Sequence, residues 1–259
     1  SSERMNLVFF TDATKHICRI SRVLKQARGN CLLVGISGSG RQSLSKLATK
    51  ILDYKLKQTV ITKNFKIDDF SKLMIELMRV TGAELTETTF MLNDADIKFE
   101  AQVECINNLL NTGEVPNLFE SDPTNQKDQI LQLVRENANK LNIMGDKWQY
   151  FVSCIRQRLH IVMTMNPIGE EFRARIRNFP AIVNCSAIDW FHPWPVDALL
   201  EVAQDKFQGF NLEIDKDKDE QWTNMIINIS PLVHKHVQEM CEKFAKQTKR
   251  QVHVTPKNY

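Results

Sequence analysis

A glycine-rich stretch of this sequence carries the residue types that bind phosphate groups. Residues 35–43 read GISGSGRQS and extend the apolar run CLLV. In loops of the form GxxxxGK(S/T), backbone N–H groups surround phosphate oxygens at a helix N-terminus, the lysine reaches the outer phosphates, and the hydroxyl holds magnesium. The sequence therefore predicts a nucleotide-binding loop, whose members are Gly35, Ile36, Ser37, Gly38, Ser39, Gly40, Arg41, Gln42 and Ser43.

Two positions of this loop depart from that form. Arg41 stands at the lysine position, and its planar guanidinium keeps the positive charge and can hold a phosphate through two N–H groups. Gln42 stands at the hydroxyl position, and Ser43 follows one residue late. We therefore expect phosphate binding to survive, whereas these changes put magnesium binding in question. A glycine-rich turn without any ligand is the alternative.

The partner of such a loop is a buried strand that ends in Asp-Glu, where the Asp supports magnesium and the Glu positions the attacking water. The candidate here is FMLNDADI, in which Asp94 follows the strand and Ala95, the next residue, cannot polarise a water. Asp96 projects to the same side of an extended chain as Asp94, so it does not take the glutamate position. The pattern favours nucleotide binding with weak or absent hydrolysis. A solvated acid in a turn is the other interpretation of Asp94.

Two further features have the chemistry that a nucleotide site uses. Asn166, at the end of the strand IVMTMN, can sense a terminal phosphate, or it can form a turn before Pro167. Three arginines in EEFRARIRNFP lie on an expected helix, where positions two apart do not share a face. One of them is a candidate for an arginine finger that reaches a neighbouring subunit's phosphate. At least two of them form a solvated basic face, and the three are Arg173, Arg175 and Arg177.

The composition is that of an ordinary globular chain. The 259 residues are 42% hydrophobic and 25% charged, with a net charge of +3 from scattered basic residues, which argues against a nucleic-acid surface. The six cysteines lack metal-ligand spacing and are expected to be thiols of a reducing compartment. No apolar run approaches the roughly 20 residues of a membrane span, and the start does not resemble a signal peptide.

Strands and helices are expected to alternate through most of the chain, which favours a parallel sheet covered on both faces. The expected strands are CLLVG, QTVIT, TTFMLND, HIVMTMNP and VNCSAID. After the break at WFHPWP, we expect only helices, at residues 195–207, 219–229 and 231–247, with the charged segment NLEIDKDKDE as a linker. The prediction is an α/β fold with a five-stranded parallel sheet between helices over residues 1–192, followed by a small helical subdomain over residues 193–259.

The order of these motifs resembles one known family. The glycine loop, the strand with its Asp, INNLLNTGEVPNLF, the strand with Asn-Pro, FRARIRNFPAIVN and AIDWFHPWP follow one another as in an AAA+ module of a dynein heavy chain. More specifically, the chain is similar to the fourth of the six modules of the motor ring, of the axonemal type, because glutamine before serine in the loop is a trait of that module. The resemblance covers Asn6 to about Phe207, and HVTPKNY resembles the point where the helical lid leads to the microtubule-binding stalk.

The resemblance implies an AAA+ P-loop NTPase fold and a role for each motif. Residues 35–43 would bind ATP or ADP, with magnesium, if bound, held through Asp94 and Ser43, and Asn166 would be the phosphate sensor. Arg175 or Arg177 would be the finger pointed at the preceding module's site. The motor as a whole hydrolyses ATP, but the departures described above mean that this module is expected to bind nucleotide and regulate the ring and stalk.

The resemblance also implies partners and a location. The partners would be the other AAA+ modules of the same heavy chain, the microtubule through the adjoining stalk, and dynein intermediate and light chains, without nucleic acid or membrane. The location would be the cytoplasm, the cytoskeleton and the axoneme of a cilium. The alternatives are a structural ring segment with an empty pocket, an independent P-loop enzyme such as a kinase, against which Ala95 argues, and an AAA+ relative that binds nucleic acid.

Overall fold

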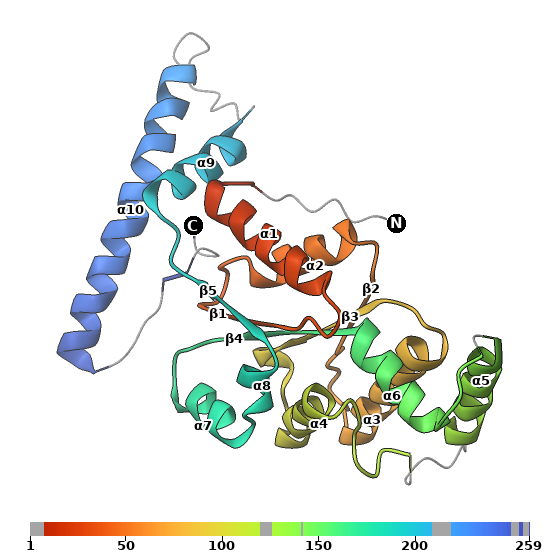
Figure 1. The fold of residues 1–259 in the computed structure, drawn as a ribbon. Helices are drawn as coiled ribbons and strands as arrows, with labels where there is room; N and C mark the ends of the chain where they lie inside the picture. Colours follow the sequence, from red (N-terminus) through yellow and green to blue (C-terminus); the bar gives the residue numbers. More distant parts are fainter. Residues whose placement is uncertain (1–7, 120–125, 141, 209–218, 250–253, 256–258) are drawn as a thin grey trace. The chain divides into compact units, whose positions relative to one another are not determined.

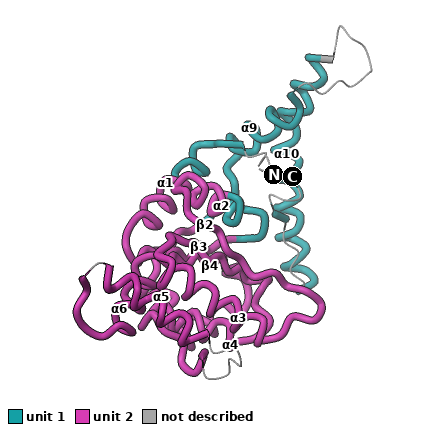
Figure 2. The backbone as a smooth tube through the Cα atoms, turned by 90° about the vertical axis from the view of Figure 1, so that its right-hand side faces the viewer, with its two compact units in different colours: residues 1–15, 36–43, 191–259 teal, residues 16–35, 44–190 magenta. Residues whose placement is uncertain are grey.

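The computed structural model describes residues 8–119, 126–140, 142–208, 219–249, 254–255 and 259. The chain divides into two compact units, shown in Figure 2. The larger unit comprises residues 16–35 and 44–190, and the smaller comprises residues 1–15, 36–43 and 191–259. Each unit is described by itself below. The sequence-based boundary at residues 192 and 193 stays a prediction.

Within the described residues, five strands form one sheet in the order β2-β3-β4-β1-β5. The strands are β1 (Cys31–Gly35), β2 (Lys55–Gln58), β3 (Thr88–Asn93), β4 (Leu159–Met165) and β5 (Ala187–Phe191). The pairs β2–β3, β3–β4 and β4–β1 are parallel, and the register of β3 on β4 runs from Thr88 opposite Leu159 to Asn93 opposite Thr164. This register places the carboxyl ends of β3 and β4 side by side, where Asp94 and Asn166 follow.

Helices cover both faces of this sheet (Figure 1). The α-helices are α1 (Thr11–Leu24), α2 (Arg41–Ile51), α3 (Ile67–Met78), α4 (Glu100–Asn111), α5 (Gln126–Lys140), α6 (Lys147–Arg158), α7 (Glu170–Asn178), α8 (Ala181–Asn184), α9 (Val196–Phe207) and α10 (Asp219–Thr248). In the larger unit, α3, α4, α6 and α8 lie on one face, and the parts of α1 and α2 that belong to this unit lie on the other. The three central strands are buried throughout, because neither face is open to solvent.

The main hydrophobic core lies between the sheet and α3, α4 and α6. Alternate residues of the strands point into it, for example Phe90 and Leu92 of β3, which are fully buried. Phe70 of α3 meets Phe90 edge to face, and their ring centroids are 6.4 Å apart. This distance is within the range of about 4.5–7 Å that aromatic pairs prefer. The predicted α/β fold with a parallel sheet is confirmed.

Two of the expected strands were wrong in position. The expected strand QTVIT is irregular beyond Gln58, and β2 lies earlier, at the edge of the sheet, where it pairs only with β3 and is mostly exposed. An edge strand needs little apolar character, so the lysines of KLKQ fit it. The expected strand VNCSAID begins too early, because Ala181–Asn184 forms α8. β5 then starts where the Ala187 N–H donates to the carbonyl of Asn30 at 2.8 Å.

The helices of the smaller unit differ from expectation at one proline. Residues 219–229 and 231–247 were expected to be two helices, but α10 is continuous and contains Pro231. A proline inside a helix removes one backbone hydrogen bond. Next to it, the Ser230 hydroxyl donates to the carbonyl of Ile226 at 2.8 Å, and Pro231 itself is buried. Most of the expected linker NLEIDKDKDE and of HVTPKNY lies outside the described residues.

Candidate functional site

The glycine loop connects β1 to α2, as the sequence predicts. Two of its glycines have left-handed backbone, with φ of 76° at Gly38 and 93° at Gly40. Side chains other than glycine rarely adopt such angles, so the loop conformation depends on these two residues. The Ser39 N–H donates to the carbonyl of Ile36 at 3.4 Å and closes a turn, and α2 begins at Arg41. The loop is therefore a tight turn ahead of a helix N-terminus, the arrangement that binds anions.

The side chains of the loop show what it offers besides backbone. The Arg41 guanidinium is half-buried and donates through Nη2 to the carbonyl of Ile36 at 3.1 Å. The Ser39 hydroxyl is buried and has no hydrogen-bond partner among the described residues. Gln42 is exposed, whereas Ser43 is half-buried. The loop thus keeps one cation and one unsatisfied hydroxyl, both of which suit a phosphate-bearing ligand.

Asp94 begins a short 3-10 turn after β3 and forms an ion pair with Arg175 of α7. Arg175 is 8% exposed, and the Asp94 side chain is 32% exposed. The second carboxylate oxygen of Asp94 lies 3.4 Å from the Asn166 backbone N–H, which donates to it. The acid expected to support magnesium therefore has an arginine as its partner within the same unit.

Asp96 has a separate partner. Its carboxylate accepts from Asn93 Nδ2 at 2.7 Å, and the Asn93 side-chain oxygen in turn accepts from the Thr164 hydroxyl at 3.0 Å. The buried amide of Gln102 accepts from the Lys98 and Phe99 N–H groups and donates to the Asp96 carbonyl. These bonds fix the turn between β3 and α4. Sequence reasoning missed Asn93 and Gln102, although polar residues on a buried strand end and at a helix start are a signal for such networks.

Asn166 forms a turn in the structure. Its side-chain oxygen accepts from the Ile168 N–H at 3.1 Å, the hydrogen bond by which Asn closes a turn on its own backbone. Its Nδ2 has no hydrogen-bond partner in the described part of the chain. The geometry agrees with the interpretation of Asn166 as a turn former. Its role as a sensor of a terminal phosphate stays a proposal.

The three arginines of α7 have different surroundings. Arg173 is exposed and lies 3.5 Å from Glu170, and Arg177 is exposed without a charged partner among the described residues. Arg175 alone is buried, because it faces Asp94. Of the two arginines expected as a finger, only Arg177 is available to another molecule in this conformation.

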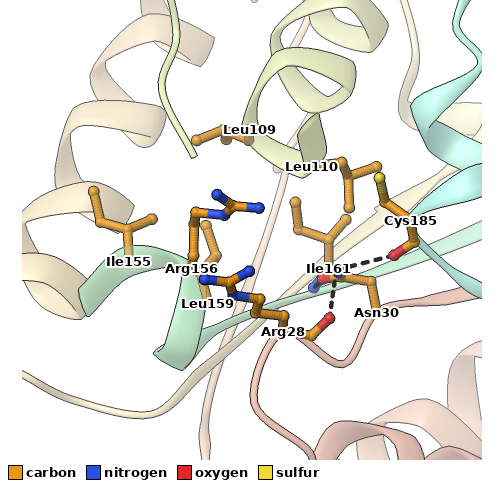
Figure 3. Close-up of a pocket in the computed structure, with 9 residues that line it drawn as sticks. All are labelled: Arg28, Asn30, Leu109, Leu110, Ile155, Arg156, Leu159, Ile161 and Cys185. Carbon is orange, nitrogen blue, oxygen red and sulfur yellow. Dashed lines mark hydrogen bonds between the residues drawn. The ribbon is translucent and has the colours of Figure 1, made fainter. Parts of the chain in front are cut away.

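A cavity of about 220 Å³ lies at the opposite ends of β1 and β4 from the glycine loop, and Figure 3 shows its lining. Arg28 and Arg156 contribute its two charges. The last turns of α4 and α6 also line it, and helix C-termini carry partial negative charge that favours nearby cations. The arginines therefore have a structural explanation, and we assign no ligand to this cavity.

Gly113 lies close against the Arg156 side chain at this cavity. Its φ is 83°, and a Cβ added there would lie 2.5 Å from Arg156 Cγ and 3.0 Å from Val152 Cγ1. We expect Gly113→Ala to lower the free energy of unfolding by about 1–3 kcal/mol, because it combines left-handed strain with a steric clash. Urea unfolding followed by circular dichroism measures the change. Gly145→Ala is the matched control, because its φ is 122° but no atom lies within 4 Å; equal losses for both variants would show that the contact with Arg156 contributes nothing.

The thiols do not suggest a nucleophile. Cys31 is buried in β1, and burial raises the pKa of its thiol to about 12, so it stays protonated at neutral pH. Among the described residues, no group of three or more His, Cys, Asp or Glu side chains is arranged to hold a metal ion.

Comparison with known proteins agrees with the loop and the sheet. The family described as the P-loop containing dynein motor region D4 matches residues 5–259. The chain belongs to this family. The resemblance seen in the sequence is thereby confirmed, and the chain is an AAA+ region of an axonemal dynein motor. Membership of this family implies nucleotide binding in general and a ring that contains further modules.

Several axonemal dyneins are similar to this dynein region over its whole length. It is 40% identical over 261 residues to dynein axonemal heavy chain 6 of Homo sapiens, and the match covers 99% of this chain and 6% of that protein. It is 36% identical over 263 residues to dynein axonemal heavy chain 1 of Mus musculus, covering 100% of this chain and 6% of the relative. The Dynein-1-beta heavy chain, flagellar inner arm I1 complex, of Chlamydomonas reinhardtii is 38% identical over 255 residues. This match covers 98% of this chain and 6% of the relative.

This dynein region thus spans about 6% of the length of the relatives it matches. No helix in the described part of the chain is both long and apolar enough to cross a membrane.

Proposed function

We propose that this dynein module binds ATP or ADP at residues 35–43 and that its occupancy regulates the motor ring next to the stalk. The observation that supports this most is the conformation of the loop, in which Gly38 and Gly40 have the left-handed backbone that a phosphate-binding turn requires. Arg41 supplies the cation for the outer phosphates, with the two N–H groups of its guanidinium in place of a lysine ammonium.

Hydrolysis by this module is proposed to be weak or absent. Ala95 cannot position an attacking water, and Asp96, the next acid along the chain, is hydrogen-bonded to Asn93. Magnesium does not fit the residues present. Gln42 replaces the usual hydroxyl, and the carboxylate of Asp94 is already paired with Arg175. The proposed role is therefore that of a module which holds nucleotide.

The partners and location are proposed from the relatives. Their names include axonemal heavy chains and a flagellar inner arm complex. We place this module in a cytoplasmic, cytoskeletal motor of a cilium or flagellum, beside other AAA+ modules of its own heavy chain. It would act on microtubules through the adjoining stalk, with intermediate and light chains as further partners. Within this ring, Arg177 is the better candidate for the finger toward the preceding module, because it is exposed.

Isothermal titration with ATP and with ADP tests the nucleotide site. We expect binding below millimolar Kd for the wild-type chain, and Arg41→Ala to weaken it about 10- to 100-fold, the loss of one charge-assisted contact. Arg41→Lys should stay within about threefold of wild type, because loops of the form GxxxxGK(S/T) carry lysine at this position and its ammonium reaches the same phosphates. Arg22→Ala is the control, since Arg22 is an exposed arginine outside the loop. No binding below millimolar by wild type would contradict the proposal, and rapid phosphate release would contradict the loss of hydrolysis.

The second candidate is a structural ring segment with an empty pocket. The hydrogen bond from Arg41 to the carbonyl of Ile36 favours it, because that guanidinium contacts the loop itself. Nucleotide released on denaturing the purified chain, identified by chromatography, would favour the binding module over this alternative.

A further inference from the structure

We propose that Arg175 is a built-in counter-cation for Asp94, so that this module binds nucleotide without a divalent metal ion. The inference rests on the proposed nucleotide-binding function and concerns the strand acid that such loops pair with for magnesium. It is carried by one juxtaposition: the acid at the end of β3, where the fold would place a magnesium-supporting carboxylate, is paired with a buried guanidinium from α7.

The surroundings of Arg175 hold it at Asp94. Its Nε lies 3.6 Å from Glu100 Oε1, and its second terminal nitrogen lies 3.7 Å from Glu171 Oε2. Both glutamates are largely exposed, with 64% and 84% of their side chains accessible, so water screens these two pairs. The Asp94 carboxylate is the least exposed of the three acids. Asp94 is therefore the main partner of Arg175. If Arg175 moved away from Asp94, a buried guanidinium would lose its charged partner, which is unfavourable.

The environment of Asp94 also leaves little for a metal ion. One carboxylate oxygen contacts Arg175, and the other accepts from the Asn166 N–H at 3.4 Å. A magnesium ion demands near-ideal octahedral geometry and is usually bound through one or two carboxylates together with several waters and substrate phosphates. A dication placed on this carboxylate would also stand beside a fixed positive charge, and like charges disfavour one another most where water is scarce. The ion pair thus replaces the metal in neutralising Asp94.

The arrangement explains why the loop can lack a well-placed hydroxyl. In a loop of the usual kind, the hydroxyl and the strand acid share one magnesium ion. Here Gln42 stands in place of the hydroxyl, and Arg175 forms an ion pair with Asp94. Both groups that would bind magnesium in a loop of the usual kind are therefore changed. The remaining cations, Arg41 in the loop and Arg175 at the acid, are permanently charged at any physiological pH.

Titration of this chain with ADP, in excess EDTA and in millimolar magnesium, tests the proposal. We expect the wild-type Kd to differ by less than about twofold between the two conditions. In Arg175→Gln, magnesium should tighten ADP binding at least about tenfold, because Asp94 is freed. Arg175→Lys keeps the charge and should behave as wild type, and Arg173→Gln, an exposed arginine on the same helix, is the matched control. A wild-type Kd that tightens tenfold or more with magnesium would overturn the proposal without any variant.

A measurement without nucleotide separates this proposal from the proposed function. Manganese, a paramagnetic substitute for magnesium, is titrated into each protein and its free fraction followed by electron paramagnetic resonance. We expect binding to Arg175→Gln at least about tenfold tighter than to wild type or Arg173→Gln. If ADP binds none of the proteins but manganese follows this order, the nucleotide site fails and the role of Arg175 stands. Equal manganese binding to wild type and Arg175→Gln would refute the counter-cation.

Discussion

Gly40→Val is expected to weaken the binding of ATP and ADP by about 100-fold or more, because the loop can no longer keep its conformation. Gly40 has a φ of 93°, and a β-branched residue is a genuine outlier at positive φ. The loop must therefore rearrange at the residue just before α2, where backbone N–H groups would meet the phosphates. A loss of about 2.7 kcal/mol of binding free energy corresponds to this factor.

The control for this change is Gly145→Val. Gly145 also has positive φ, 122°, but a Cβ there meets no atom within 4 Å, and it lies outside the glycine loop. Both variants place a β-branched residue at positive φ, so a change in nucleotide affinity confined to Gly40→Val reports on the loop and not on stability. Isothermal titration gives the affinities, and circular dichroism checks that both variants are folded. Unchanged affinity in Gly40→Val would show that nucleotide does not bind through this loop.

Sequence alone predicts the central sheet well and its edges poorly. The strands CLLVG and TTFMLND and the strand that ends before Asn166 are continuous apolar runs, since parallel strands covered on both faces must be apolar throughout. The edge strand β2 has no such requirement, so KLKQ carried no signal and the neighbouring apolar TVI was chosen instead. Pro231 also misled the prediction, because the local rule that a proline ends a helix does not hold in α10, which continues through it.

The candidate site was predictable in its loop but not in its ion pair. The glycine spacing, the strand before it and the helix after it are all local features of the chain. Asp94 and Arg175 are 81 residues apart, and they meet only because β3 and β4 are neighbours and α7 follows β4. The alternation of the arginines indicated only that they do not share one face. Which of them is buried depends on the tertiary contact with Asp94, and no periodicity in the sequence encodes it.

Asn30→Ala is expected to lower the free energy of unfolding of the larger unit by about 2–4 kcal/mol, because it leaves buried backbone groups without partners. Asn30 is 8% exposed and joins three segments of the chain, as Figure 3 shows in part. Its Nδ2 donates to the carbonyls of Arg28 at 3.0 Å and Cys185 at 3.3 Å. Its Oδ1 accepts from the Ile161 N–H at 2.8 Å, inside the sheet. Urea unfolding followed by circular dichroism measures the loss, with the exposed Asn111→Ala as control.

A second variant distinguishes the contribution of the Asn30 Nδ2 from that of its Oδ1. Asn30→Asp keeps an oxygen that accepts from the Ile161 N–H but turns a carboxylate toward the carbonyls of Arg28 and Cys185, which repel it. We therefore expect Asn30→Asp to be destabilised as well, while hydrogen exchange at the Ile161 amide stays slow. In Asn30→Ala, the same amide should exchange faster, because its acceptor is gone. If both variants unfold at the wild-type urea concentration, these hydrogen bonds add no net stability, and the junction of β1, β4 and β5 is held by its apolar packing alone.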